Sequence, residues 1–159
     1  NKNYLALLVF AFLIAVLYGS TLFNGFVLDD YPVVVDNPYI QSFQHLPKVV
    51  SGCIWEAALG GCEGRTLHYR PIVNLSYLLT WQISSSPWFF HLVNLLYFLA
   101  AVFLVFLLVQ ALTKSFTLSF FTGLLFLFHP INSESVNWIS AVADLTFGIF
   151  VLLTLLLYA

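Results

Sequence analysis

Two neighbouring aspartates, Asp29 and Asp30, follow the first apolar stretch of the chain, in the sequence NGFVLDDYP. A carboxylate in such a place can take a proton from a hydroxyl as a general base, or it can ligate a divalent cation through its oxygens. A pair of aspartates after a helix can also be a helix cap or part of a solvated loop. The pair alone leaves these interpretations open.

Other polar residues stand at later points where an apolar stretch begins or ends. They are Arg70; His91 and Asn94, which share a helical face at i and i+3; and His129, Glu134 and Asp144. If the helices bring them to one membrane depth, they form an acidic pocket that could activate a hydroxyl. Such a pocket could also hold Mg or Mn, with Asp30, Glu134 and Asp144 as the candidate ligands.

Arg70 has two possible roles in such a pocket. Its planar guanidinium could bind a lipid-linked phosphate through two parallel hydrogen bonds. It could instead pair with Asp29, Asp30 or Glu134 as a structural bridge. The spacing of these residues in the sequence does not decide between the two.

Asp144 lies about two turns inside the last apolar stretch. A carboxylate in such a place costs at least roughly 2.5–3.5 kcal/mol on membrane-insertion scales, so we expect it to have a partner or a use. On a continuous helix it would belong to a small polar stripe made of Asn137, Ser140, Asp144 and Gly148. The simpler interpretation is that Asp144 only pairs with another helix.

The composition is that of an all-α integral membrane protein. Of 159 residues, 61% are hydrophobic and 8% are charged, whereas about 25% are charged in a typical soluble domain. The alternation typical of membrane β-barrels is absent. No basic patch indicates a nucleic-acid partner, so the lipid bilayer is the expected environment. The chain contains no Met, and we expect it to be a piece of a longer protein.

We expect about four transmembrane helices, over residues 1–23, 88–112, 116–128 and 136–159. A long first loop, 24–87, joins the first two, and short turns at 113–115 and 129–135 join the others. Within the long loop, residues 42–50 and 71–83 are predicted to form short helices, and the pattern of 71–83 suits a helix lying along the membrane surface.

The charged residues predict which way the helices point. With four spans, Lys2 and Lys114 share one side that carries no acid, and the positive-inside rule places that side in the cytoplasm. The long loop and the turn at 129–135 are then extracytoplasmic. This side carries Lys48, Arg65 and Arg70 together with all the acids, namely Asp29, Asp30, Asp36, Glu56, Glu63, Glu134 and Asp144.

Cys53 and Cys62 flank a short stretch of the long loop. On the extracytoplasmic side, two cysteines this close in sequence are predicted to form a disulfide that staples a small loop. Metal binding is disfavoured there because His45 and His68 lack the spacing of zinc ligands.

Four motifs together resemble a known family. NGFVLDDYPVVVDNPYI, YRPIVNLSYLLTWQI, PWFFHLVNLLYF and HPINSESVNWISAVAD look like the N-terminal half of the membrane module in the TMTC proteins and their bacterial relatives. Those proteins are GT-C-type glycosyltransferases and are often followed by tetratricopeptide repeats. The resemblance covers nearly the whole chain from Asn24 onward, and it implies a partial GT-C module.

The resemblance also implies an activity. A polyprenyl-phosphate sugar would be the donor, and a protein hydroxyl on the extracytoplasmic face of the bacterial inner membrane or the ER membrane would be the acceptor. Asp29 or Asp30 would be the catalytic acidic residue, and a single inverting displacement would follow. Some GT-C members use a divalent cation. The residues expected to line the donor phosphate or to support the aspartates are Arg70, His91, Asn94, His129, Glu134 and Asp144.

Two other functions remain open at this point. Relatives commonly carry Arg or Lys directly before the aspartate that aligns with Asp144, whereas this chain reads Ala141-Val142-Ala143. A non-catalytic subunit that kept the fold and has a structural role among other membrane subunits is therefore the alternative. A channel or transporter is disfavoured because the first two spans are almost wholly apolar at their middles.

Overall fold

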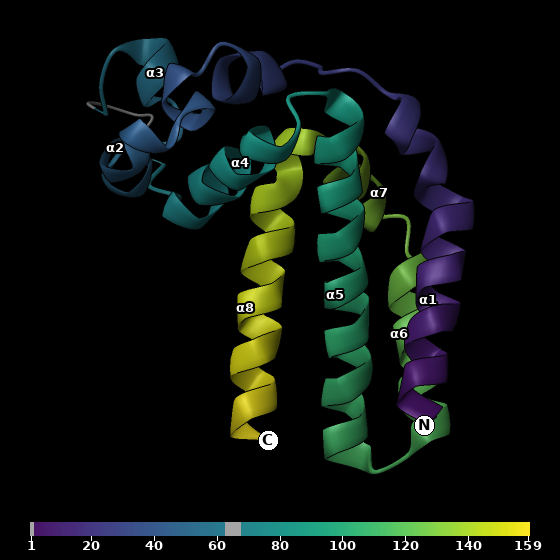
Figure 1. Ribbon diagram of the computed structural model, residues 1–159. Coiled ribbons are helices and arrows are strands. Elements are labelled where there is room, and N and C mark those ends of the chain that lie inside the picture. Colours follow the sequence, from purple (N-terminus) through teal and green to yellow (C-terminus); the bar gives the residue numbers. More distant parts are fainter. Residues whose placement is uncertain (1, 63–67) are drawn as a thin grey trace.

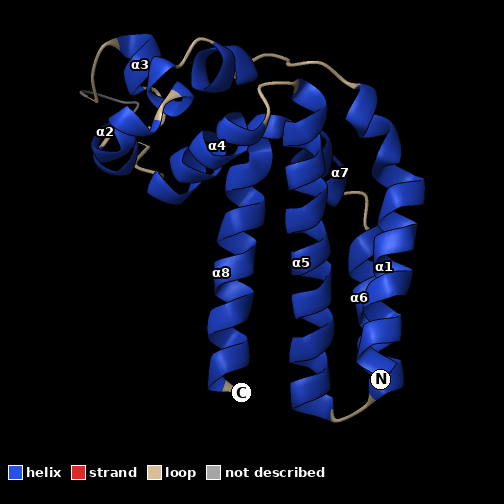
Figure 2. Cartoon of the chain, viewed as in Figure 1, coloured by secondary structure: helices blue, strands red, loops and turns tan. Residues whose placement is uncertain are grey.

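The computed structural model describes residues 2–62 and 68–159, and all regular structure in these ranges is helical, as predicted. The long helices α1 (Lys2–Tyr18), α5 (Pro87–Thr113) and α8 (Val142–Tyr158) run side by side, with α6 (Phe116–Phe128) next to α1 (Figures 1 and 2). The segment between α1 and α5 lies across one end of these helices, and both termini lie at the other end. Glu63 and Arg65, counted above for orientation, lie outside the described residues.

Within the described ranges, three helical segments are long and apolar enough to cross a bilayer: Lys2–Phe23, which includes the 3-10 helix η1 (Gly19–Phe23), Pro87–Thr113 and Ile139–Tyr158. The predicted span at 116–128 does form a helix, α6, but it has only 13 residues and is about 20 Å long. The apolar core of a bilayer is about 30 Å thick, so α6 is too short to cross it without help from its neighbours.

Helices α1, α5 and α6 pack through aromatic rings, and we call them the aromatic bundle. The Phe10 ring stacks on Phe120, with centroids 5.4 Å apart, and meets Phe106 edge to face at 6.0 Å. Gly123 allows this close approach, because a Cβ at that position would lie 2.7 Å from the Phe10 ring. A small residue that lets two backbones approach is typical of helix packing in membranes.

The segment across the end of the bundle, residues 24–62 and 68–86, is here called the head region. It contains short helical turns: η2 (Tyr31–Val35), η3 (Pro38–Gln41), η4 (Phe43–His45), α2 (Leu46–Ser51) and α3 (Glu56–Leu59). Its longest helix, α4 (Pro71–Ile83), occupies the predicted range. Cys53 and Cys62 form the predicted disulfide, with Cα atoms 5.7 Å apart.

The face of α4 turned away from the core is apolar. Ile72, Leu79 and Ile83 are exposed there, and Leu75 on the same face is partly exposed. Its opposite face packs Val73, Tyr77 and Leu78 into the core of the head region. This is the arrangement expected of a helix lying at a membrane surface.

The predicted continuous helix over 136–159 was wrong. Helix α7 (Asn132–Asn137) ends before Trp138, whose backbone is extended (φ −106°, ψ 123°), and the 3-10 turn η5 (Ile139–Ala141) precedes α8. The cause is that two buried side chains, Asn94 and Asp30, form hydrogen bonds with backbone groups at the break. Asn94 Nδ2 donates to the Trp138 carbonyl at 2.9 Å, and the Asp30 carboxylate accepts from the Ser140 N–H at 2.9 Å.

Candidate functional site

A polar pocket of about 240 Å³ lies where the head region meets the start of α8. Asp29 and Trp55 line it from the head region, and Arg70 lines it from the residue before α4. The break between α7 and α8 contributes Trp138 and Ser140, and the first turn of α8 contributes Asp144. Residues far apart in the chain therefore meet at one pocket, as the sequence predicted for Asp29, Arg70 and Asp144.

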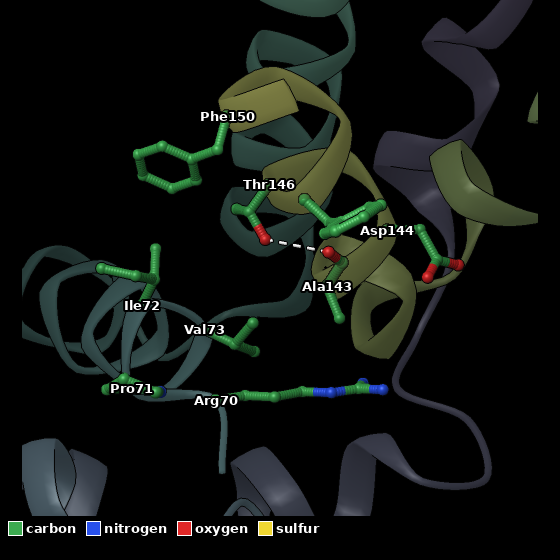
Figure 3. A pocket seen from close by; sticks show the side chains of 9 residues that line it. Arg70, Pro71, Ile72, Val73, Ala143, Asp144, Thr146 and Phe150 are labelled. Atoms are coloured by element: carbon green, nitrogen blue, oxygen red, sulfur yellow. Dashed lines mark hydrogen bonds between the residues drawn. The ribbon is translucent and has the colours of Figure 1, made fainter. Parts of the chain in front are cut away.

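An apolar groove of about 280 Å³ adjoins this pocket between α4 and α8. Ile72 and Val73 line it on one side, and Phe147 and Phe150 on the other. The two cavities share Arg70, Ala143 and Asp144 as lining residues. Figure 3 shows the Arg70 side chain extended from the start of α4 past Ala143. A molecule with a charged head and an apolar chain could occupy both cavities at once.

The two neighbouring aspartates differ in their surroundings. Asp30 is fully buried, with an exposed fraction of 0%. Its Oδ2 accepts from the Val27 N–H at 2.9 Å, and its Oδ1 accepts from the Ser140 N–H at 2.9 Å and from the Ser140 hydroxyl at 2.5 Å. Asp29 is partly exposed and lines the polar pocket, and its carboxylate makes no hydrogen bond to any described residue. Of these two aspartates, Asp29 is thus the one whose carboxylate is free to act on a ligand.

Arg70 and Asp144 are both exposed. Lys48 and Glu56 in the head region form the one ion pair found among the described residues. Arg70 therefore does not form the structural bridge to Asp29, Asp30 or Glu134 that was considered above. Arg70 is also the only cationic residue that lines either cavity in the described part of the chain. It is therefore available to bind an anion.

His91 and Asn94 lie behind the pocket rather than in it. Asn94 holds the Trp138 carbonyl, as described above. His91 is 1% exposed, and its ring nitrogens have no hydrogen-bond partner at ordinary geometry among the described residues, although the Gly25 backbone and the Asp30 carboxylate are close by. Asn94 therefore supports the break between α7 and α8.

His129 and Glu134 do not line either cavity. Both are exposed, and His129 Nδ1 accepts a hydrogen bond from the Ile131 N–H at 3.3 Å in the turn before α7. The described residues contain no group of three His, Cys, Asp or Glu side chains close enough to hold a metal ion. Asp30, Glu134 and Asp144 are not gathered into one such group within the described residues.

Tyr77 and Trp138 belong to the site region without having been predicted there. The Tyr77 hydroxyl lies 3.4 Å from the Ile139 carbonyl, next to the helix break. Burial, with the nearby Asp30 charge, raises the pKa of Tyr77 far above its usual value, so its hydroxyl stays a neutral donor. No pattern in the sequence placed the Trp138 ring at the pocket.

Comparisons with known proteins bear on this site. The chain is 32% identical over 142 residues to Protein O-mannosyl-transferase TMTC3 of Homo sapiens, covering 89% of the chain and 15% of that protein. It is 35% identical over 147 residues to Protein O-mannosyl-transferase Tmtc2 of Drosophila melanogaster, covering 90% of the chain and 15% of that protein. The chain is TMTC-like. The resemblance stated from its motifs is confirmed.

The TMTC-like chain spans about one-sixth of the length of the curated relatives it matches, including Protein O-mannosyl-transferase tmtc2 of Xenopus laevis, at 34% identity and 17% of that protein. No family model matches the chain. No solved structure gives a significant match.

Proposed function

We propose that this chain forms the catalytic-loop part of a GT-C-type membrane glycosyltransferase that transfers mannose to protein hydroxyls. The names of its relatives support the reaction class. The observation that carries the proposal is the pocket itself. The Asp29 carboxylate and the Arg70 guanidinium line it together, neither makes an ion pair with a described residue, and an apolar groove lies next to it.

The proposed donor is a polyprenyl-phosphate sugar. Its phosphate binds Arg70, whose guanidinium can give two parallel hydrogen bonds to phosphate oxygens. Its lipid chain leaves the polar pocket through the groove between α4 and α8, in contact with Ile72 and Phe147. The sugar then occupies the polar pocket beside Asp29, and Trp55 and Trp138 offer it flat aromatic surfaces.

In the proposed reaction Asp29 is the general base. It takes the proton of the acceptor hydroxyl, and the hydroxyl oxygen attacks the anomeric carbon of the sugar from the face opposite to the phosphate. The bond between that carbon and the phosphate oxygen breaks, and polyprenyl phosphate leaves with the electron pair. Arg70 stabilises the negative charge on the leaving phosphate. The configuration at the anomeric carbon is inverted.

We place the pocket on the extracytoplasmic side. Lys2 begins α1 and Lys114 follows α5, both at the end of the bundle opposite the head region (Figure 1). The positive-inside rule assigns the end with these lysines to the cytoplasm. The disulfide in the head region requires an oxidising compartment, which agrees with this orientation.

The decisive experiment is the substitution Asp29→Asn, assayed as mannose transfer from polyprenyl-phosphate mannose to proteins extracted from the same cells. The amide cannot accept the proton, so we expect the rate to fall by about 10²–10⁴-fold, with an unchanged unfolding temperature. Asp36→Asn is the matched control, because Asp36 is exposed and lines neither cavity. Full activity of Asp29→Asn would refute the proposal and favour the non-catalytic subunit.

A further inference from the structure

Asp29 and Asp30 differ in burial and in hydrogen bonding, which indicates different roles in the pocket. We infer that Asp30 is a positioning residue that holds Asp29 and Asp144 on facing walls of the pocket and takes no proton itself. This inference rests on the proposed function, because it assigns the second acidic residue of that same site. It is carried by two hydrogen bonds from Ser140 to the Asp30 carboxylate, which join segments 110 positions apart in the chain, and by a third from the Val27 N–H within the turn that contains Asp30.

On the first wall, Asp30 stabilises an unusual turn. Leu28, directly before Asp29, has φ 47°, in the left-handed region that residues with a Cβ rarely adopt. The Asp30 carboxylate accepts from the Val27 N–H on the far side of Leu28, at 2.9 Å. This bond closes the turn across Leu28. The direction in which Asp29 leaves the turn therefore depends on the Asp30 side chain.

On the second wall, the same carboxylate holds the helix break. Its Oδ1 accepts from both the N–H and the hydroxyl of Ser140, within the 3-10 turn that precedes α8. Asp144 follows one helical turn later and lines the pocket. Because one carboxylate binds both segments, the separation of the two walls is fixed by Asp30.

The geometry also argues against Asp30 as the base. Its exposed fraction is 0%, and both of its oxygens are already engaged by donors. An acceptor hydroxyl would have to displace Ser140 or the Val27 N–H to reach it. Loss of the carboxylate should therefore misplace the reacting groups while leaving the base itself intact, and a displacement of about 1 Å can lower a rate about 10²-fold.

The test is a set of variants of the full protein in membranes, with transfer normalised to folded protein. Asp30→Asn replaces one acceptor oxygen by an NH₂ group that faces a donor, and it should lower kcat about 10–100-fold with little change in KM for polyprenyl-phosphate mannose. Ser140→Ala should lower kcat less, and Ser140→Thr, which keeps the hydroxyl, should restore it. The double variant Asp30→Asn/Ser140→Ala should be no slower than Asp30→Asn alone, because both act through one contact.

Gln110→Leu is the control for a structural effect elsewhere. It removes the paired hydrogen bonds between Gln110 and Asn3 at the opposite end of the bundle, and kcat per folded molecule should stay at the wild-type value. A kcat of Asp30→Asn as low as that of Asp29→Asn would overturn the inference, as would a wild-type kcat or additive effects of the Asp30 and Ser140 substitutions. If Asp30→Asn does not fold, a wild-type kcat for Ser140→Ala overturns it.

The outcomes separate the two proposals. Activity retained in Asp29→Asn refutes the proposed function whatever Asp30→Asn does. An inactive Asp29→Asn together with an unimpaired Asp30→Asn refutes only the positioning role.

Discussion

The head region and the aromatic bundle are held together by different forces. In the bundle, ring contacts such as those of Phe10 with Phe120 and Phe106 fill the core. Away from the end of α5 that lies beneath the head region, Ser119 is the bundle's buried polar side chain among the described residues. In the head region and the part of α5 beneath it, the core also contains Asp30, Asn37, Asn74, Ser76, Thr80, His91 and Asn94.

This difference separates stability from function. Buried apolar contacts do not depend on a particular orientation of the groups that touch. Buried hydrogen bonds do, and they therefore fix particular backbone groups in place. The polar core of the head region is therefore suited to hold a pocket in one geometry, and the bundle is suited to hold the fold. Substitutions in the bundle should change the amount of folded protein, and substitutions in the head region should change what the folded protein does.

The largest effect is expected in the bundle. Phe10→Ala removes a ring that is 0% exposed and contacts α5 and α6. It should lower the free energy of unfolding by about 3–5 kcal/mol, since the neighbouring rings cannot collapse into the cavity. Thermal unfolding in detergent measures this loss. Mannose transfer per folded molecule should stay unchanged, and a large fall in it would break the proposed separation.

Removal of the Cys53–Cys62 disulfide should have the second largest effect. Cys53→Ser/Cys62→Ser opens a loop closed over nine positions, and the stability of the head region should fall by about 2–4 kcal/mol. Trp55 lies inside this loop and lines the polar pocket, so transfer should fall as well. Hydrogen exchange localises the change. Faster exchange in α1 and α6 rather than in the head region would contradict the division into two regions.

Arg70→Ala should affect binding without a comparable effect on stability. Arg70 is exposed and makes no ion pair with a described residue, so its loss leaves no buried partner unpaired. The KM for the polyprenyl-phosphate donor should rise about 10–100-fold, equivalent to about 1.4–2.7 kcal/mol.

Arg70→Lys is the informative companion variant. It keeps the charge but not the paired hydrogen bonds, so its KM should lie between those of the wild type and Arg70→Ala. An unchanged KM in Arg70→Ala would show that the phosphate binds elsewhere.

The smallest effect is expected for Lys48→Ala. The Lys48–Glu56 ion pair is exposed to solvent on the lysine side, and the hydrogen bond to Glu56 raises the pKa of Lys48. Exposed ion pairs contribute little to stability, so the unfolding temperature and the KM for the donor should both stay at wild-type values. A clear loss of transfer would place Lys48 in the functional site and extend the site beyond the pocket.

Part of this arrangement could be predicted from local sequence patterns. Composition and apolar length indicated a helical membrane protein, Pro71 and the spacing of apolar residues gave α4, and the cysteine spacing gave the disulfide. The positions of Asp29, Arg70 and Asp144 at the ends of apolar stretches were enough to predict one shared pocket, because the membrane boundary places such ends at one depth.

The rest depends on contacts between distant residues. The break at Trp138 needs Asn94 and Asp30, which lie 44 residues from Trp138 and 110 residues from Ser140, and no periodicity within 136–159 reveals them. For the same reason the different surroundings of Asp29 and Asp30 could not be predicted from two identical neighbouring residues. Glu134 was misplaced because the turn predicted at 129–135 contains the start of α7, where Glu134 is exposed and lines neither cavity.

The most direct test is a structure of the protein in lipid nanodiscs with polyprenyl-phosphate mannose bound to the inactive Asp29→Asn variant. The phosphate should lie within hydrogen-bonding distance of the Arg70 guanidinium, with the lipid chain between α4 and α8 and the sugar next to residue 29. Density for the phosphate away from Arg70, or for the lipid chain on the far side of α5, would contradict the account.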